Sequence, residues 1–327
     1  MQITSHMDLL EQTKEICRVN KIYPSRSKGQ NFLIAEDVYE RIIAASDLKK
    51  NDLVLEVGPG LGFLTAKLAA KAGLVTAIEL DNKLAGYLRE KISTDKVDNV
   101  KIFNENVLDF DIKKIFLTVD NIKTPPILPF VRGGTKNSPP CEGGAGGGYK
   151  IVANLPYNIT SVFIRKFLTA VHKPEKMILM LQKEVAERIC AKPGEMSLLA
   201  LSVQFFSEPE IVSYVPKENF WPMPKVDSAI IRITCHSRES GNPVKSANGD
   251  VSGSRVKPGM TDEKEFFRLA KIGFSAKRKM LKNNLAGGLH TTPAEVEKTL
   301  IKIGLNPKAR AEELAIGDWK NLTFEFK

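Results

Sequence analysis

The feature that most constrains the fold is a short apolar run that leads directly into a glycine-rich turn. Leu53–Val57 is apolar apart from Glu56, and Gly58-Pro59-Gly60-Leu61-Gly62 follows it. An apolar run of this length that ends in glycine is typical of a buried strand. A helical pattern continues from the turn to about Ala72, so the segment predicts a strand–turn–helix unit of an α/β protein.

Strands and helices continue to alternate along the chain, which favours a mostly parallel sheet with right-handed crossovers. Further strands are expected at Leu74–Leu80, Val100–Phe103, Lys150–Ala153, Met177–Leu181, Ile211–Val215 and Ser228–Thr234. No long helix fits between the last two strands, so we expect them to form an antiparallel hairpin at one edge. From about Asp262 onward the pattern is helical only, which predicts a small all-helical C-terminal domain.

The predicted domain organisation has five parts. Residues 1–28 are expected to form a helical, charged lead-in, and residues 29–235 a large α/β domain. Residues 118–148 and 236–261 are rich in Pro, Gly, Ser and Asn and contain few large apolar residues. Such segments do not bury enough surface to offset their ordering entropy, so we expect two disordered insertions. Residues 262–327 complete the chain as the helical domain.

The composition narrows the class of protein. The 327 residues contain 48 Lys and Arg against 38 Asp and Glu, a net charge of +10, which suits a nucleic-acid partner or simple solubility. The scattered Cys17, Cys141, Cys190 and Cys235 favour a reducing cytoplasm and predict no metal site and no disulfide framework. There is no secretory signal and no apolar run of about 18 residues, so we expect no membrane association. A monomer is expected.

The glycine turn and a distant acid predict a nucleoside-containing cofactor. Gly58 and Gly60 allow close backbone approach to a ligand, and Glu79 ends the next strand about twenty residues on, where it can accept ribose hydroxyls. The third glycine comes too early for G-x-G-x-x-G, and Pro59 intrudes, which favours S-adenosylmethionine over NAD. Asn106 follows the third strand and either contacts the adenine edge or forms a turn.

Asn154-Leu155-Pro156-Tyr157 follows the fourth strand and has the chemistry to hold a flat base by its exocyclic amine. The Asn154 side chain offers an acceptor oxygen, and Pro156 fixes the turn so that the Leu155 carbonyl can face the same amine. Tyr157 offers a stacking face, worth about 1–3 kcal/mol per base. The alternative is a plain proline turn that closes a strand.

Six blocks follow one another along the chain: Gly29–Leu33, Glu56–Gly60, Ile78–Asp81, Asn154–Ile159, Leu181–Ala186 and Phe220–Ser228. Together they resemble one family, the KsgA-type (RsmA) small-subunit ribosomal RNA adenine dimethyltransferases. The resemblance covers about residues 12–327 apart from the two insertions. It implies a Rossmann-like class I methyltransferase domain, which transfers methyl groups from S-adenosylmethionine to the N6 amines of two adjacent adenosines near the 3′ end of the small-subunit RNA. The partner is then the immature small ribosomal subunit.

The resemblance also assigns roles to individual residues. It places Gln30, Asn31 and Leu33 over the methionine end of the cofactor, Gly58 and Gly60 at its backbone, Glu79 at the ribose, and Asn106 and Asn154 nearby. Asn106 is usually Asp in the family. Tyr157 and Phe220 are expected to sandwich a flipped adenine, although Phe220 alone suits a core aromatic. Lys277, Arg278, Lys279 and Lys282, predicted at the start of a C-terminal helix, are expected to contact RNA phosphates rather than form a plain solvated face.

Three other functions stay open from the sequence. One is a large-subunit ribosomal RNA adenine methyltransferase of the macrolide-resistance type, which the Phe220–Ser228 block and the C-terminal region weigh against. Another is a ribosome-assembly factor with little catalysis, which the intact Gly58–Gly60 and Asn154–Tyr157 blocks weigh against. An NAD oxidoreductase is the least favoured.

Overall fold

The computed structural model describes residues 7–25, 29–117, 148–236 and 263–327. They fall into two compact units, the first within Met1–Ala186 and Pro209–Cys235 and the second within Glu187–Glu208 and His236–Lys327. Nearly all of the two segments predicted to be disordered, 118–148 and 236–261, lies outside the described residues. None of the helices among the described residues is long and apolar enough to cross a membrane.

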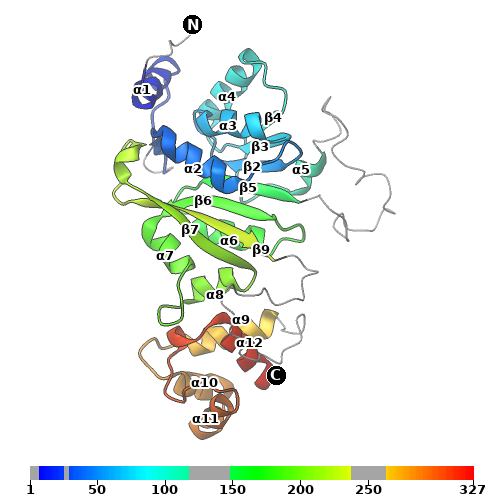
Figure 1. The fold of residues 1–327 in the computed structure, drawn as a ribbon, viewed down its shortest axis with the longest axis vertical. Coiled ribbons are helices and arrows are strands. Elements are labelled where there is room, and N and C mark those ends of the chain that lie inside the picture. Colours follow the sequence, from blue (N-terminus) through cyan, green and yellow to red (C-terminus); the bar gives the residue numbers. More distant parts are fainter. Residues whose placement is uncertain (1–6, 26–28, 118–147, 237–262) are drawn as a thin grey trace, which may run out of the picture. The chain divides into compact units, whose positions relative to one another are not determined.

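The first unit has strands with helices between them (Figure 1). The seven strands that the sequence predicts occur in the predicted order, together with two short strands that it did not predict. Its strands are β1 (Phe32–Leu33), β2 (Leu53–Val57), β3 (Leu74–Ile78), β4 (Val100–Phe103), β5 (Tyr149–Asn154), β6 (Lys176–Gln182), β7 (Ser207–Val215, which begins in the second unit), β8 (Phe220–Trp221) and β9 (Ser228–Cys235). Its helices are α1 (Leu9–Val19), α2 (Glu36–Ser46), α3 (Phe63–Lys71), α4 (Asn82–Thr94), α5 (Lys113–Leu117), α6 (Thr160–Leu168) and the start of α7 (Lys183–Ile189).

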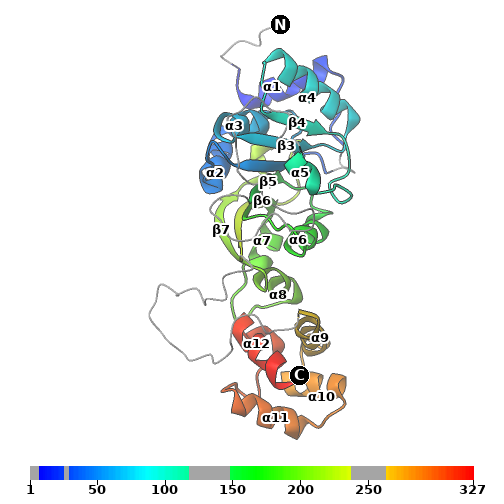
Figure 2. The same ribbon diagram turned by 90° about the vertical axis from the view of Figure 1, so that its right-hand side faces the viewer.

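A seven-stranded sheet forms the centre of this unit, with the strand order β4-β3-β2-β5-β6-β9-β7. The pairs β2–β3, β3–β4, β2–β5 and β5–β6 are parallel, and β9 runs antiparallel to β6. Every residue of β2 and β3 is buried, because helices cover both faces of a parallel sheet. Figure 2 shows α2 and α3 on one face and α5 and α6 on the other.

The predicted hairpin at the sheet edge is present. β7 and β9 are neighbours, and their contacts step in opposite directions along the two segments, as in an antiparallel pair. The His236 N–H donates to the Phe206 carbonyl, Arg232 pairs with Glu210, and the Lys217 N–H donates to the Asp227 carboxylate. The mixed α/β fold class predicted from the sequence is therefore confirmed.

A second, two-stranded sheet and the N-terminal helix close one side of the first unit. β1 and β8 pair antiparallel, with Leu33 opposite Phe220 and Phe32 opposite Trp221. Helix α1, which falls in the predicted lead-in, packs Ile16 and Cys17 into a small apolar cluster with Phe32 and residues of the glycine turn and α4. The lead-in is thus part of the first compact unit.

The second unit is helical and has its own core. It contains α8 (Leu198–Gln204), α9 (Glu263–Gly273), α10 (Leu281–Leu289), α11 (Pro293–Lys302) and α12 (Ile316–Glu325). Residues 187–208 belong to it, although the sequence predicted one α/β domain over 29–235. The physical reason is packing: Met196, Ala200 and Leu201 share a buried cluster with Phe266 and Trp319, so this stretch covers the helical core.

Candidate active site

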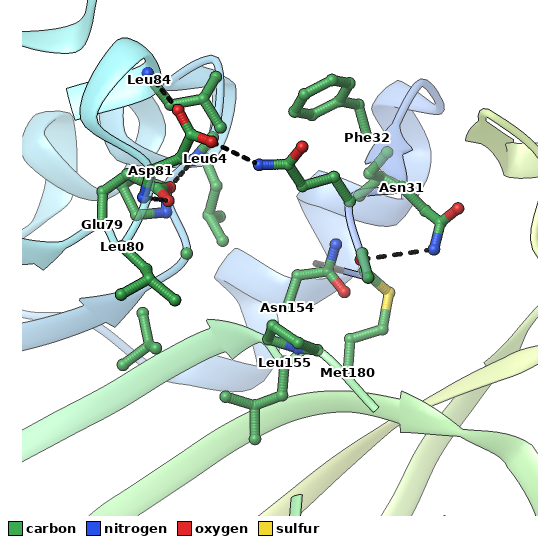
Figure 3. Close-up of a pocket in the computed structure, with 18 of the residues that line it drawn as sticks. Asn31, Phe32, Leu64, Glu79, Leu80, Asp81, Leu84, Asn154, Leu155 and Met180 are labelled. Carbon is green, nitrogen blue, oxygen red and sulfur yellow. Dashed lines mark hydrogen bonds between the residues drawn. The ribbon is translucent and has the colours of Figure 1, made fainter. Parts of the chain in front are cut away.

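A cavity of about 280 Å³ opens at the carboxyl ends of β2, β3, β5 and β6. This is the edge where open α/β sheets bind ligands, because the loops that follow the parallel strands meet there. Its lining comes from the segment around β1, the glycine turn, the end of β3, the loop after β4 and the turn after β5. Figure 3 shows the Asn154 amide near the middle of this space, between Glu79 and Asp81 on one side and Asn31 on the other.

The turn after β2 brings backbone close to the cavity. Gly58 and Gly60 have φ angles of 69° and 56°, in the left-handed region where side chains are strained. A Cβ on Gly60 would lie 3.3 Å from the Phe32 ring, and one on Gly58 would lie 3.5 Å from the Asn154 carbonyl oxygen. Both glycines line the cavity, so the predicted backbone approach is available at this turn.

Glu79 places a buried carboxylate at the end of β3. Only 6% of the residue is exposed, and its oxygens accept hydrogen bonds from the N–H groups of Gly60 (3.2 Å) and Asp81 (2.9 Å). Burial raises the pKa of this carboxyl, and the two N–H donors oppose that rise. Each oxygen has a further lone pair, so the group can still accept from a ligand hydroxyl.

The segment around β1 also lines the cavity, with the Phe32 ring beside the glycine turn. The Gln30 side chain accepts from the Ser25 N–H (2.8 Å) and donates to the Asp81 carboxylate (3.4 Å). Asn31 and Leu33 also line the cavity. Asp81 caps α4 by accepting from the N–H groups of Lys83 and Leu84, so Gln30 is tied to a rigid helix end.

Asn106 lines the cavity but uses its amide locally. The side-chain oxygen accepts from the Leu108 N–H at 3.0 Å, and the amide nitrogen donates to the Asp109 carboxylate at 2.9 Å. This is the turn-forming role that the sequence left open for this residue. The adenine contact stays a prediction, and it would use the second lone pair of the same oxygen.

The turn after β5 presents unpaired acceptors. The Leu155 N–H donates to the Met180 carbonyl (3.2 Å), and the Ile159 N–H donates to the Pro156 carbonyl (3.2 Å), which fixes the path of the turn. Within the described residues, neither the Asn154 side-chain amide nor the Leu155 carbonyl has a hydrogen-bond partner. Two acceptors of the kind that the sequence predicted therefore remain available beside the cavity.

The two predicted stacking rings differ in their surroundings. Tyr157 is half-buried, and its hydroxyl lies 3.0 Å from the Ser228 hydroxyl of β9. Burial raises the pKa of the Tyr157 hydroxyl, and the Ser228 bond opposes that rise. Phe220 also lines the cavity but is only 3% exposed, because the β1–β8 pairing sets it in the core beside α2. Phe220 therefore forms a wall here, with little open ring face.

The predicted basic cluster is divided in the structure. Lys277, Arg278 and Lys279 are exposed in the loop between α9 and α10, before the helix start where they were predicted. Lys282, on α10, donates to the Glu297 carboxylate of α11 at 2.7 Å, and only 18% of its side chain is exposed. Lys282 is thus paired within the protein, while the other three remain candidates for phosphate contacts.

Two site residues were present in the sequence blocks but received no role there. Ser228 holds the Tyr157 hydroxyl, and Asp81 holds both Gln30 and the start of α4. Their positions at the ends of the Phe220–Ser228 and Ile78–Asp81 blocks were the available signal. Their partners lie 71 and 51 residues away, which no local pattern indicates.

The fold and the site together define a class I methyltransferase that uses S-adenosylmethionine. The parallel sheet with an antiparallel edge, the glycine turn after β2 and the buried acid after β3 supply the features of that class. The residues present fit the cofactor, because the glycine backbone, the Glu79 carboxylate and the apolar wall of Leu33 and Leu64 face one cavity.

The chain belongs to the ribosomal RNA adenine dimethylase family, whose model matches residues 24–248. It is 38% identical to the ribosomal RNA small subunit methyltransferase A of Dehalococcoides mccartyi (strain CBDB1), over 99% of this chain and 96% of the relative. The proteins of the same name from Moorella thermoacetica and Enterococcus faecalis are 32% and 34% identical, each over 95% of this chain and over 96% and 93% of the relative.

Two solved structures share the fold. A dimethyladenosine transferase from Plasmodium falciparum has a TM-score of 0.67 at 22% identity and covers 90% of this chain and 97% of its own. The 23S rRNA methyltransferase ErmE has a TM-score of 0.63 at 24% identity, with coverage of 90% and 99%. The protein is therefore an enzyme that methylates adenine in ribosomal RNA with S-adenosylmethionine, as predicted, and the NAD oxidoreductase alternative is wrong.

Proposed function

We propose that the protein dimethylates the N6 amines of two adjacent adenosines near the 3′ end of small-subunit ribosomal RNA. The curated relatives that match nearly the whole chain carry the name ribosomal RNA small subunit methyltransferase A, which supports this acceptor. The single observation that carries the chemistry is the pair of acceptors at Asn154 and Leu155, which have no partner in the part of the chain that the structure describes and lie beside a cavity that suits the cofactor. A cytoplasmic location and an immature small subunit as partner belong to the same proposal.

The catalysis we propose is positional. The N6 amine of adenine is a poor nucleophile because its lone pair is delocalised into the ring. The Asn154 side-chain oxygen and the Leu155 carbonyl accept the two N6 hydrogens, favour a more tetrahedral nitrogen and stabilise the positive charge that develops on it. The cofactor, when bound, supplies an already activated methyl group, so no strong base is required. Correct alignment of two reactants contributes up to roughly 7–11 kcal/mol to lowering a barrier.

The acceptor base is held by the same turn. Tyr157 stacks on the flipped adenine, and its hydroxyl bond to Ser228 fixes the orientation of the ring. Phe220 completes the wall on the side of β8, where its packing makes it rigid. The methylated amine releases one proton to solvent after each transfer. One N6 hydrogen therefore remains after the first transfer, and the stack together with one hydrogen bond holds the base for the second.

The test is methyl transfer from labelled S-adenosylmethionine to small subunits that lack the modification, followed by identification of the modified nucleosides. N6,N6-dimethyladenosine in the small-subunit RNA supports the proposal. The same nucleoside in large-subunit RNA alone would favour the macrolide-resistance type. Tight binding to immature subunits without transfer would favour an assembly factor, and Asn154→Ala gives the matched inactive control.

A further inference from the structure

Lys166 of α6 donates three hydrogen bonds to the backbone of the loop that follows β4. The Lys166 ammonium donates to the carbonyl oxygens of Leu108 (2.7 Å), Phe110 (2.8 Å) and Val107 (3.1 Å). An ammonium has three N–H donors, so all of them are satisfied by this one loop. Charge-assisted bonds of this kind are stronger than neutral ones, and three on one atom fix its position.

The loop that Lys166 holds is a wall of the cofactor cavity. Glu105, Asn106 and Val107 line the cavity, and Val107 and Phe110 bury their side chains in the core below it. Asn106 accepts from the Leu108 N–H, while Lys166 donates to the carbonyl of the same Leu108. The two side chains therefore hold the two ends of one residue, and the orientation of Asn106 depends on the position that Lys166 sets.

The backbone of Lys166 belongs to the helix that follows the acceptor turn, Asn154–Ile159. Helix α6 begins at Thr160, directly after Asn154–Ile159, and it is fixed on its inner face by the buried Phe163 and Phe167. Lys166 lies in the last turn of this helix. Lys166 thus connects the helix that follows the acceptor turn with the loop after β4, which also lines the cavity.

The three carboxylates near Lys166 have hydrogen-bond or ion-pair partners of their own. Glu105 pairs with Lys114, Asp109 accepts from Asn106, and Asp111 accepts from the Lys113 N–H. Among the described residues, no carboxylate lies within ion-pair distance of the Lys166 ammonium. The hydrogen bonds of the ammonium therefore go to backbone carbonyls, while the Phe167 ring lies 5.9 Å away and the carboxylates of Asp109, Asp111 and Glu105 act on the charge at longer range.

We propose that Lys166 is a positioning residue for S-adenosylmethionine: it fixes the loop 105–110, of which residues 105–107 line the cavity. The inference rests on the proposed function only in that the cofactor occupies this cavity. A lysine suits the role because three carbonyls converge on a compact ammonium, whereas the planar fork of arginine spreads its donors. Lys166 does not touch the reacting atoms in this role, so it governs cofactor affinity more than the rate of transfer.

The experiment compares Lys166→Met, Lys166→Arg and the matched control Arg165→Met, an exposed neighbour on the same helix. We expect Lys166→Met to raise the Kd and the KM for S-adenosylmethionine about tenfold. The kcat at saturating cofactor and the KM for RNA should stay within about twofold of the wild type. Lys166→Arg should lie between the two, and Arg165→Met should behave as the wild type.

A readout on the cofactor-free protein separates positioning from general loss of stability. In hydrogen exchange, the amides of Leu108 and Asp109, both bonded within this turn, should exchange about tenfold faster in Lys166→Met. Amides of β2 and β3 should not change. An unchanged Kd for the cofactor, or an equal rise in Arg165→Met, would overturn the inference. If the wild-type protein itself did not transfer methyl groups to small subunits, the proposed function would fail instead.

Discussion

Two walls of the cavity differ in how their polar groups are used. The cofactor wall, formed by Gly58, Gly60, Glu79 and Asp81, is internally bonded: Glu79 accepts from two backbone N–H groups, and Asp81 caps α4. The acceptor wall, formed by Asn154, Leu155 and Tyr157, leaves its two carbonyl-type acceptors without partners among the described residues. Among the described residues, the side chains of this wall make one hydrogen bond, the Tyr157–Ser228 contact, which orients the tyrosine ring.

This difference shows which wall is prepared for recognition and which for chemistry. A bonded wall costs little reorganisation when the cofactor enters, so it contributes mainly to affinity. In the proposed mechanism, the two acceptors that have no partner among the described residues are satisfied only when the amine arrives, and their bonds strengthen as positive charge develops on N6. Substitutions on the two walls should therefore separate cofactor affinity from the rate of transfer.

The largest effect is expected on the acceptor wall. Asn154→Ala removes the side-chain acceptor, and we expect kcat to fall by about 10²–10³, because the group acts on charge in the transition state. The Kd for S-adenosylmethionine should change little. Labelled methyl transfer and calorimetry measure the two quantities. Asn51→Ala, an exposed asparagine before β2, is the matched control. A variant with near-normal kcat would remove Asn154 from the mechanism.

The next effect is expected on the cofactor wall. Glu79→Gln replaces one acceptor oxygen with an amide nitrogen that faces the N–H of either Gly60 or Asp81. Loss of a charge-assisted bond costs about 1.5–3 kcal/mol, so the Kd for the cofactor should rise about 10- to 100-fold. At saturating cofactor, kcat should recover. Glu90→Gln, exposed on α4, controls for the lost charge. If kcat stayed low at saturating cofactor, Glu79 would also affect the rate of transfer, and the two walls would not separate affinity from rate.

A smaller effect is expected from the bond that orients the tyrosine. Tyr157→Phe and Ser228→Ala each remove one side of the 3.0 Å contact, and each should raise the KM for RNA about fivefold, in line with ~1 kcal/mol for one hydrogen bond. If the bond acts as a unit, the double variant should be no worse than either single one. Simple additivity of the two effects in steady-state kinetics would show that the hydroxyls act independently.

Much of the framework was predictable because it is encoded locally. The apolar runs of β2, β3 and β5, the glycine turn and Glu79 follow from period, composition and spacing alone. The hairpin at the edge followed from the short interval between its strands. The assignment of residues 187–208 was not predictable, since Met196 and Leu201 are apolar residues that either core could bury.

The parts of the site that sequence reasoning missed all depend on partners far away in the chain. Lys166 binds carbonyls 56 to 59 residues before it, and Ser228 binds a tyrosine 71 residues before it. The sequence left Phe220 open between a stacking ring and a core aromatic, and pairing of β8 with β1 buries most of it. Such contacts arise from tertiary packing and leave no mark in the local pattern.

The smallest effect is expected in the second unit. There the predicted basic cluster divides into three exposed residues, Lys277, Arg278 and Lys279, and one paired lysine, Lys282. Replacing Lys277, Arg278 or Lys279 singly by Gln should weaken RNA binding about threefold near physiological salt. It should also flatten the plot of log K against log salt by about 0.7–0.9, because each phosphate contact releases about that many counterions. Lys282→Gln should leave this slope unchanged, because Lys282 is held by Glu297.

The salt slope distinguishes the two kinds of lysine even where affinities are similar. Removing one partner of the Lys282–Glu297 pair affects the free energy of unfolding by about 1 kcal/mol or less, since the pair lies near the surface, and it does not change the number of phosphates neutralised. Filter binding across a salt series, with urea unfolding in parallel, measures both. If Lys282→Gln flattened the slope as much as Lys279→Gln, Lys282 would leave Glu297 to bind RNA, and the division of the cluster would hold only for the RNA-free protein.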